Sequence, residues 1–199
     1  MIENIFEKNI ILENERALLR PLEQSDFNNL ISFSLNEPDI WKYGLITAAG
    51  EDNLRSYLHG AVTNRQQEKE YPFIVFDKKA NAYAGSTRFY DIQQSYLSAQ
   101  LGFTWYGKKF QQTGLNRHCK LLILSFAFEE WGLERIQFQA HAANDRSIKA
   151  MKAIGCIEEG ILRSHMPTVD GSRRDSVVLS ILKSEWESGI KEMLKIKTH

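Results

Sequence analysis

The 199-residue sequence predicts a mixed α/β or α+β fold, with helices packed around a sheet that contains an antiparallel meander. Three observations favour this class. Two helical patterns follow an initial strand, three β-rich runs come next with only short turns between them, and helices then alternate with the remaining strands. No repeat, low-complexity segment or linker divides the chain, so we expect one domain over residues 1–199.

The first half of the chain contains short β-rich runs and two helical patterns. Ser25 or Asp26 is the expected N-cap of the first helix, and Pro38 ends it. Apolar residues at helical spacing indicate the second helix, whereas β-branched and aromatic residues indicate strands. The expected elements are a strand at 17–22, a helix beginning after Ser25 or Asp26, a helix at 51–65, and strands at 71–76, 82–90 and 98–105.

The second half is centred on a long amphipathic helix. Leu115, Cys119, Leu122 and Phe126 recur at helical spacing, and Gly132 is a typical residue to end such a helix. The remaining expected elements are a strand at 135–140, a helix at 144–154, strands at 156–165 and 176–182 joined by a turn at Asp170–Gly171, and a last helix capped by Ser184 and Glu187.

Charge and composition exclude several function classes. Lys and Arg total 25 and Asp and Glu total 25, so we expect neither a nucleic-acid nor a membrane partner. Cys119 and Cys156 lie outside any CxxC motif and the five histidines are scattered, which disfavours a metal site. Gly114 is not followed by Lys and Ser or Thr, which disfavours a P-loop.

The sequence also favours a soluble, cytoplasmic protein. Residues 1–8 mix acidic with apolar side chains, unlike a secretion signal, and no apolar run is long enough to cross a bilayer. The two isolated cysteines are typical of small buried hydrophobic residues in a reducing compartment.

The polar loop Gln111–Asn116 lies between a strand and the long helix. A helix N-terminus presents unpaired N–H groups and the positive end of a dipole, which together can bind a phosphate or pyrophosphate. A simple capped helix start explains the hexapeptide equally well. The loop therefore needs support from other parts of the chain.

That support comes from three other segments. Residues 101–105 precede the loop and long helix, and residues 144–147 and 155–163 follow them. The series resembles the GNAT acetyltransferase superfamily, and within it the branch that acetylates the N-termini of ribosomal proteins. The resemblance extends from Leu19–Leu22 to Ser184–Trp186. It implies a twisted, mixed, mostly antiparallel sheet that is splayed between the family's fourth and fifth strands, here 98–105 and 135–140, with acetyl-CoA in the resulting cleft.

The resemblance also assigns residues to the acetyl-CoA site. Main-chain N–H groups of the loop would hold the pyrophosphate, with cationic contacts from Lys108 and Lys109, and no metal is implied. The pantetheine arm would pair like an added strand with the splayed strand, and a helix-start asparagine would face it. The residues so assigned are Phe103, Thr104, Trp105, Gln111, Gln112, Thr113, Gly114, Leu115, Asn116, Asn144 and Ser147.

Asn116 departs from the family pattern, which has glycine or alanine at this position. The Asn116 side chain could crowd the phosphates, or it could donate its amide to a phosphate oxygen. We favour the second interpretation.

Transfer to an amine requires a neutral amine, a stabilised oxyanion and a proton for the departing thiolate. By resemblance the N–H of Phe103 or Thr104 serves the oxyanion, and the sequence does not choose between them. Many relatives place a tyrosine proton donor where this chain has Met151, which cannot donate. Ser147 stands where the N-terminal branch has a serine. Its hydroxyl could relay the proton or simply help to cap the helix.

The general base is the least specified group. The branch has a glutamate where this chain reads Ser164-His165-Met166-Pro167. His165 is a candidate base because its ordinary pKa of roughly 6.5 suits proton removal at neutral pH, although an exposed strand-end histidine is the more common case. Asp175, Glu37 or an ordered water are the alternatives.

The acceptor is expected to be a primary amine, with a protein N-terminal amine leading by resemblance. A small-molecule amine and an inactive acyl-CoA-binding module remain alternatives, and a homodimer is plausible in this family. Charged residues of the last hairpin and two aromatic residues of the first loop occupy positions that border the acceptor cleft in relatives, although a solvated charged face and core aromatics explain them too. These residues are Arg163, Arg173, Arg174, Asp175, Trp41 and Tyr43.

Overall fold

The computed structural model describes residues 4–168 and 171–198, and its eight strands form one sheet. The spatial order is β1-β2-β3-β4-β5-β6-β8-β7, and every neighbouring pair is antiparallel except β5 and β6. The strands are β1 (Leu12–Glu13), β2 (Ala17–Pro21), β3 (Tyr71–Asp77), β4 (Ala82–Gln93), β5 (Ser98–Tyr106), β6 (Arg135–His141), β7 (Ile157–Pro167) and β8 (Arg173–Leu182). The mixed, mostly antiparallel sheet is confirmed.

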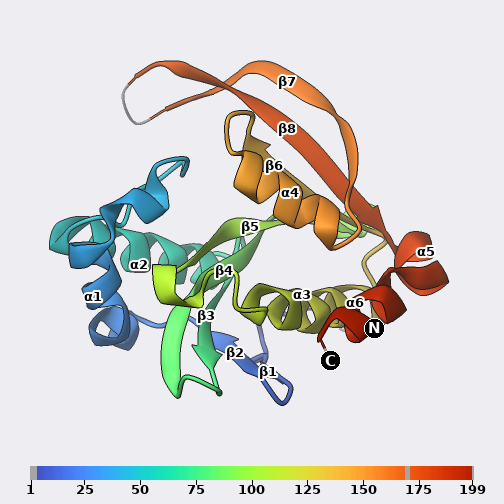
Figure 1. The fold of residues 1–199 in the computed structure, drawn as a ribbon, viewed down its shortest axis with the longest axis horizontal. Helices are drawn as coiled ribbons and strands as arrows, with labels where there is room; N and C mark the ends of the chain where they lie inside the picture. Colours follow the sequence, from blue (N-terminus) through green and yellow to red (C-terminus); the bar gives the residue numbers. More distant parts are fainter. Residues whose placement is uncertain (1–3, 169–170, 199) are drawn as a thin grey trace.

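The helices lie around this sheet. α1 packs on α2, α3 packs on β1, β2 and α6, and α4 packs on β6. Figure 1 shows α1 and α2 together at one end of the molecule, and the β7–β8 hairpin arching past α4 toward that end. Their bounds are α1 (Phe27–Asn36), α2 (Glu51–Gln66), α3 (Leu115–Ser125), α4 (Asp145–Ala153), α5 (Lys183–Glu185) and α6 (Lys191–Thr198), with π-helical turns at Phe126–Trp131 and Trp186–Ile190. None of the helices in the described part of the chain is long and apolar enough to cross a membrane.

The parallel pair β5 and β6 separates soon after it begins. Only Ser98–Gln100 pairs with Arg135–Gln137, although β5 runs on to Tyr106 and β6 to His141. A bulge adds to the separation: Ser86 pairs with Trp105 and Arg88 with Gly102, so the bulged strand β5 carries one extra residue there. Phe103 in this bulge has a positive φ of 49°. The splay expected between these two strands is therefore present.

The expected order of helices and strands is confirmed, and most boundaries agree within a few residues. The predicted cap of the last helix is wrong. Leu182 donates its N–H to Glu185 Oε2 at 2.9 Å, so the helix begins two residues before the expected Ser184 and Glu187 pair. Strand β1 was not expected, because two residues carry too little pattern. Asp170 of the predicted turn lies outside the described residues.

Candidate active site

A cavity of about 510 Å³ opens where β5 and β6 separate. Its walls come from the splayed ends of both strands, from α3 and α4, and from the loop that follows α1. Thr113, Leu115 and His165 are not among its lining residues. The other residues that the sequence assigns to the site all line it, namely Phe103, Thr104, Trp105, Gln111, Gln112, Gly114, Asn116, Asn144 and Ser147.

Side chains of β4, α2 and the loop after α1 hold the β5 wall of the cavity in position. The hydroxyls of Thr104 and Thr87 lie 2.8 Å apart, which fixes the bulge against β4. Trp105 donates its indole N–H to the Tyr57 hydroxyl at 3.2 Å, and its ring lies 5.0 Å from that of Trp41. Beyond Gln100 the β5 edge has no strand partner on the β6 side, so it can accept an extended ligand by added-strand pairing.

The loop before α3 opens toward the cavity at Gly114 and Asn116. Gly114 has φ 91° and ψ −19°, a left-handed conformation that glycine adopts readily, and a Cβ built there meets nothing within 4 Å. The N–H groups of Gly114 and Asn116 donate no hydrogen bond to any described residue. They are therefore available to an anion at the helix N-terminus.

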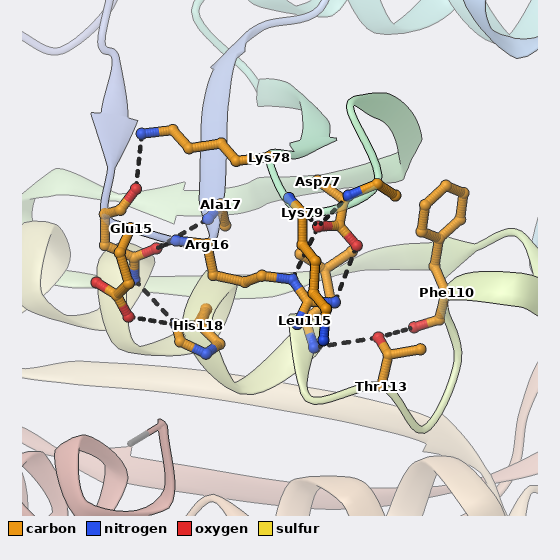
Figure 2. Close-up of polar contacts among 12 residues, drawn as sticks. Glu15, Arg16, Ala17, Asp77, Lys78, Lys79, Phe110, Thr113, Leu115 and His118 are labelled. Atoms are coloured by element: carbon orange, nitrogen blue, oxygen red, sulfur yellow. Dashed lines mark hydrogen bonds and ion pairs between the residues drawn. The ribbon is translucent and has the colours of Figure 1, made fainter.

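Thr113 and Leu115 stabilise this loop from the other side. The Thr113 hydroxyl donates to the Phe110 carbonyl at 2.8 Å, and the Leu115 N–H lies 3.4 Å from the same hydroxyl (Figure 2). The Leu115 side chain is fully buried in the core. One turn later in α3, His118 Nδ1 lies 3.2 Å from a Glu15 carboxylate oxygen beside β2, as Figure 2 also shows. The start of α3 is thus anchored to the sheet.

Two arginines lie beside the loop, and sequence reasoning missed both. Arg117 and Arg146 line the cavity, whereas the expected Lys108 and Lys109 do not. Arg146 donates to Gln111 Oε1 at 2.5 Å, and Gln111 in turn donates to the Tyr106 carbonyl at 2.8 Å. The position of Arg117, three residues after Gly114 in the first helical turn, was the available signal. Both cations suit a phosphate-bearing ligand.

The side chain of Asn116 is oriented by Tyr106. The Tyr106 hydroxyl donates to Asn116 Oδ1 at 3.3 Å, and this leaves the amide NH₂ as the free end of the side chain. The arrangement supports the interpretation that Asn116 donates to a phosphate.

Replacing Asn116 by alanine is expected to reduce the rise in melting temperature that acetyl-CoA causes, while the melting temperature without ligand stays nearly the same. The reason is that the variant loses one donor to the ligand but only one long hydrogen bond, to Tyr106, within the protein. Thermal unfolding with and without acetyl-CoA measures this. An equal ligand-induced shift in both proteins would remove the side-chain role.

The start of α4 shows which side chain caps this helix. Asn144 is the N-cap, and its Oδ1 accepts the Ser147 N–H at 3.1 Å. The Ser147 hydroxyl makes no hydrogen bond to another described residue, and Ser147 lines the cavity. The capping side chain is therefore that of Asn144. Met151 also lines the cavity, at the position where relatives place a tyrosine.

None of the expected base candidates lines the cavity. Glu37 accepts the Lys108 N–H at 2.6 Å, and Asp175 accepts the Ser164 N–H at 2.7 Å. His165 lies on β7, and its buried Nδ1 has no hydrogen-bond partner among the described residues. His165 as the base stays a prediction.

His141, at the end of β6, does line the cavity. Its Nδ1 accepts the Ala143 N–H at 3.0 Å, which places the proton of the neutral ring on Nε2. The neutral ring then presents a hydrogen-bond donor on its other side rather than a base.

Two cationic side chains, Lys120 and Arg174, line the cavity and are buried. The sequence did not predict their burial. Lys120 of α3 is 5% exposed, and its ammonium donates to the Thr104 hydroxyl at 3.2 Å. Burial lowers the pKa of Lys120 from its ordinary 10.5 to about 8. Arg174 of β8 is likewise 5% exposed, and burial lowers the pKa of its guanidinium.

The remaining chemistry-bearing groups do not suggest another reaction. Burial raises the pKa of both Cys119 and Cys156 to about 12, so neither thiol is a ready nucleophile. No cluster of His, Cys, Asp or Glu within the described ranges could hold a metal ion.

Comparison with known proteins gives consistent matches. The family model described as "Acetyltransferase (GNAT) domain" matches residues 16–157. The Bacillus subtilis (strain 168) protein named "Putative ribosomal N-acetyltransferase YdaF" is 27% identical over 180 residues, which cover 87% of this chain and 95% of that protein.

Two solved structures illustrate the likeness in fold. A GCN5-related N-acetyltransferase from Brucella melitensis has a TM-score of 0.88 at 23% identity, covering 96% of this chain and 86% of that one. A ribosomal-protein-S5-alanine acetyltransferase from Vibrio fischeri has a TM-score of 0.72 at 18% identity, covering 89% of this chain and 99% of that one. At these identities the two structures show a common fold.

Proposed function

The chain belongs to the GNAT acetyltransferase family, whose model covers residues 16–157, and we propose that this acetyl-CoA-dependent N-acetyltransferase acts on the N-terminal amine of a protein. The Bacillus subtilis relative, named "Putative ribosomal N-acetyltransferase YdaF", supports an acceptor that belongs to the ribosome. The observation that carries the proposal is the make-up of the cavity lining.

The residues around the loop fit acetyl-CoA. The free N–H groups of Gly114 and Asn116, with Arg117 and Arg146 beside them, suit a pyrophosphate. The open β5 edge at Phe103, Thr104 and Trp105 suits the amide-bearing pantetheine arm. When bound, acetyl-CoA supplies a thioester carbonyl for attack by the amine and a thiol as leaving group.

The cavity lining favours an acceptor whose amine is partly neutral at physiological pH without the help of a protein base. The described lining residues are apolar, aromatic, amide, hydroxyl and basic, with no Asp or Glu among them. A protein α-amine has a pKa of roughly 7.7–8.0, so about 30% of it is neutral at about pH 7.5. A lysine-like alkyl amine, with a pKa of roughly 10.4, is only about 0.1% neutral there. An N-terminal amine therefore needs the least help from a base.

Within this proposal the protein supplies two further contributions. A main-chain N–H at the β5 bulge, from Phe103 or Thr104, would donate to the carbonyl oxygen during transfer. The Ser147 hydroxyl, which has no partner among the described residues, would hydrogen-bond the departing sulfur and relay to it a proton that the acceptor amine releases. His165 remains a candidate base that would act through water, since it does not line the cavity.

Replacing Ser147 by alanine is expected to lower kcat at least about 10-fold with little change in acetyl-CoA affinity or stability. The hydroxyl makes no bond that holds the fold, because Asn144 caps α4. Steady-state kinetics, calorimetric titration with acetyl-CoA and thermal unfolding provide the three readouts. Asn144→Ala is the contrasting variant and should lose stability by about 1 kcal/mol. Equal losses of kcat and affinity in Ser147→Ala would indicate a structural role.

The acceptor proposal is tested by thiol release from acetyl-CoA across a matched panel at pH 7.5. The panel contains a C-terminally amidated peptide with a free N-terminus, a peptide blocked at its N-terminus but carrying lysine, spermidine, and glucosamine. We expect release with the free N-terminus and very little with the blocked peptide or spermidine. Faster reaction of spermidine or glucosamine would replace the protein acceptor by a small amine, and binding without release for any amine would favour an acyl-CoA-binding module.

A further inference from the structure

Arg174 lies on β8, at the end of this strand where the neighbouring strands β5 and β6 are splayed apart. Ser176 pairs with His141 at the last position of β6, and Arg174 lies two residues beyond that point. Its side chain lines the cavity together with Tyr43, Tyr90 and His141. The rings of Tyr43 and His141 are 5.4 Å apart, and Arg174 Nη1 donates to the Tyr43 carbonyl, so these three residues lie together in the cavity wall. The main-chain N–H groups that we assign to the pyrophosphate belong instead to the loop before α3.

The hydrogen bonds of Arg174 hold its guanidinium in place without neutralising it. Nε donates to the Ser176 hydroxyl at 3.2 Å, and Nη1 donates to the Tyr43 carbonyl at 3.2 Å. Nη2 has no hydrogen-bond partner among the described residues, and no described carboxylate forms an ion pair with Arg174. The guanidinium is therefore positioned while part of its donor fork remains free.

The other buried arginine shows what the fold does when an arginine is structural. Arg88 is 2% exposed, its Nη1 donates to the Glu70 carboxylate at 2.6 Å, and its guanidinium stacks on the rings of Tyr57 and Phe103. Its Nε and Nη2 have no hydrogen-bond partner among the described residues, so what distinguishes Arg88 from Arg174 is the paired carboxylate. A buried charge is ordinarily paired because its removal from water is costly. Arg174 is buried almost as deeply, yet its neighbours are a hydroxyl, a carbonyl and the phenol of Tyr90.

A ligand carboxylate would supply the missing partner. The described cavity lining contributes Arg117, Lys120, Arg146 and Arg174 and no acidic side chain, so an anion entering it meets only positive charge. A guanidinium with a free donor fork binds carboxylates in a directional manner, and the interaction gains strength in a site shielded from water. We assign the two arginines near the loop to phosphate, and Lys120 donates to the Thr104 hydroxyl, which leaves Arg174 as the cation with a free donor fork for the acceptor.

We propose that Arg174 anchors a carboxylate-binding subsite at the acceptor end of the cavity, so that the preferred amine acceptor carries a carboxylate near its amine. The inference rests on the proposed function and takes the cavity wall around Arg174, Tyr43 and His141 as the acceptor side. For a protein acceptor the carboxylate is an acidic side chain in the first residues, and for a small acceptor it is the carboxylate of an amino acid.

The test compares acceptors that differ only in this charge. Amidated peptides with a free N-terminus and either Glu or Gln at the second or third residue test whether a side-chain carboxylate is recognised. A comparison of glycylglycine with glycylglycine amide tests whether a terminal carboxylate is recognised. We expect kcat/KM to favour the carboxylate member of at least one pair by 10-fold or more, mainly through KM.

Substitutions at Arg174 test whether this residue causes the preference for a carboxylate. Arg174→Met should reduce the ratio between carboxylate and amide acceptors to about one, and Arg174→Lys should restore part of it, while acetyl-CoA affinity from calorimetric titration stays unchanged. Arg55→Met is the control, because Arg55 is exposed on α2, pairs with Glu51 and does not line the cavity. Thermal unfolding confirms that each variant is folded.

The outcomes separate the two proposals. Equal use of Glu and Gln peptides and of both glycylglycine forms by the wild-type protein overturns the subsite, even if peptide N-termini are good acceptors. A preference that survives in Arg174→Met overturns the assignment to this residue. Acetylation of carboxylate-bearing small amines but of no peptide keeps the subsite and removes the protein acceptor.

Discussion

Replacing Lys120 by methionine is expected to raise the free energy of unfolding at pH 7 by about 3 kcal/mol. The Lys120 ammonium is 5% exposed, and its described contacts are the Thr104 hydroxyl at 3.2 Å and the Phe138 ring at 5.8 Å. Neither contact neutralises a full charge. Methionine has a similar length, suits a helix and removes the cost of burying that charge.

The pH dependence of this effect has a definite sign. Burial lowers the pKa of Lys120 to about 8 in the folded protein, against an ordinary value of 10.5. Between these two values the unfolded chain holds the proton and the folded protein does not, so wild-type stability rises with pH in that window. Below about pH 8 both states are charged and the full penalty is present. The gap of pKa values corresponds to about 3 kcal/mol.

Urea unfolding at pH 7 and pH 9.5 measures the effect. The advantage of Lys120→Met should fall to roughly half by about pH 9.5, because the wild-type side chain is neutral in the folded state there. Lys149→Met is the control, since Lys149 is exposed on the neighbouring α4 and should change stability by less than about 0.5 kcal/mol at either pH. A destabilised Lys120→Met at pH 7, or a difference that does not vary with pH, would contradict a buried charged lysine.

The fold was largely predictable because its elements carry strong local patterns. The spacing of Leu115, Cys119, Leu122 and Phe126 indicated the central helix, and Gly132 indicated its end. The point at which β5 and β6 separate has no such local signal. It depends on the bulge at Phe103 and on where pairing with Gln137 stops, and only the family resemblance implied it.

The buried cations could not be predicted from the sequence for a physical reason. Lysine and arginine are ordinarily exposed, so a pattern-based reading places Lys120 on the solvent side of the helix. Arg173 and Arg174 are adjacent on a strand and must face opposite sides, but the pattern does not say which one is buried. The structure shows Arg174 buried and Arg173 exposed. Their burial depends on tertiary packing around a cavity.

Replacing Gly114 by alanine is expected to weaken acetyl-CoA binding by at least about 10-fold. This loss of affinity should exceed what the lower stability of the variant alone would cause. At φ 91° an L-residue costs about 1–2 kcal/mol of stability. No protein atom lies within 4 Å of the added methyl group, so the protein itself has room for it. The methyl group would instead occupy space in front of the free N–H groups of Gly114 and Asn116, where we expect the pyrophosphate.

Gly50→Ala separates this loss of binding from loss of stability. Gly50 is also a helix N-cap, has φ 87°, meets nothing within 4 Å of a built Cβ and does not line the cavity. Both variants should lose stability because both place an L-residue at positive φ, and Gly50→Ala should lose more, since its ψ of 156° lies in a region that only glycine populates, whereas Gly114 with ψ −19° is in the left-handed region. Calorimetric titration with acetyl-CoA should then show an unchanged Kd for Gly50→Ala and a raised Kd for Gly114→Ala. Equal Kd values in the two variants would mean that the ligand does not approach the main chain at Gly114, and the pyrophosphate would have to bind through Arg117 and Arg146 alone.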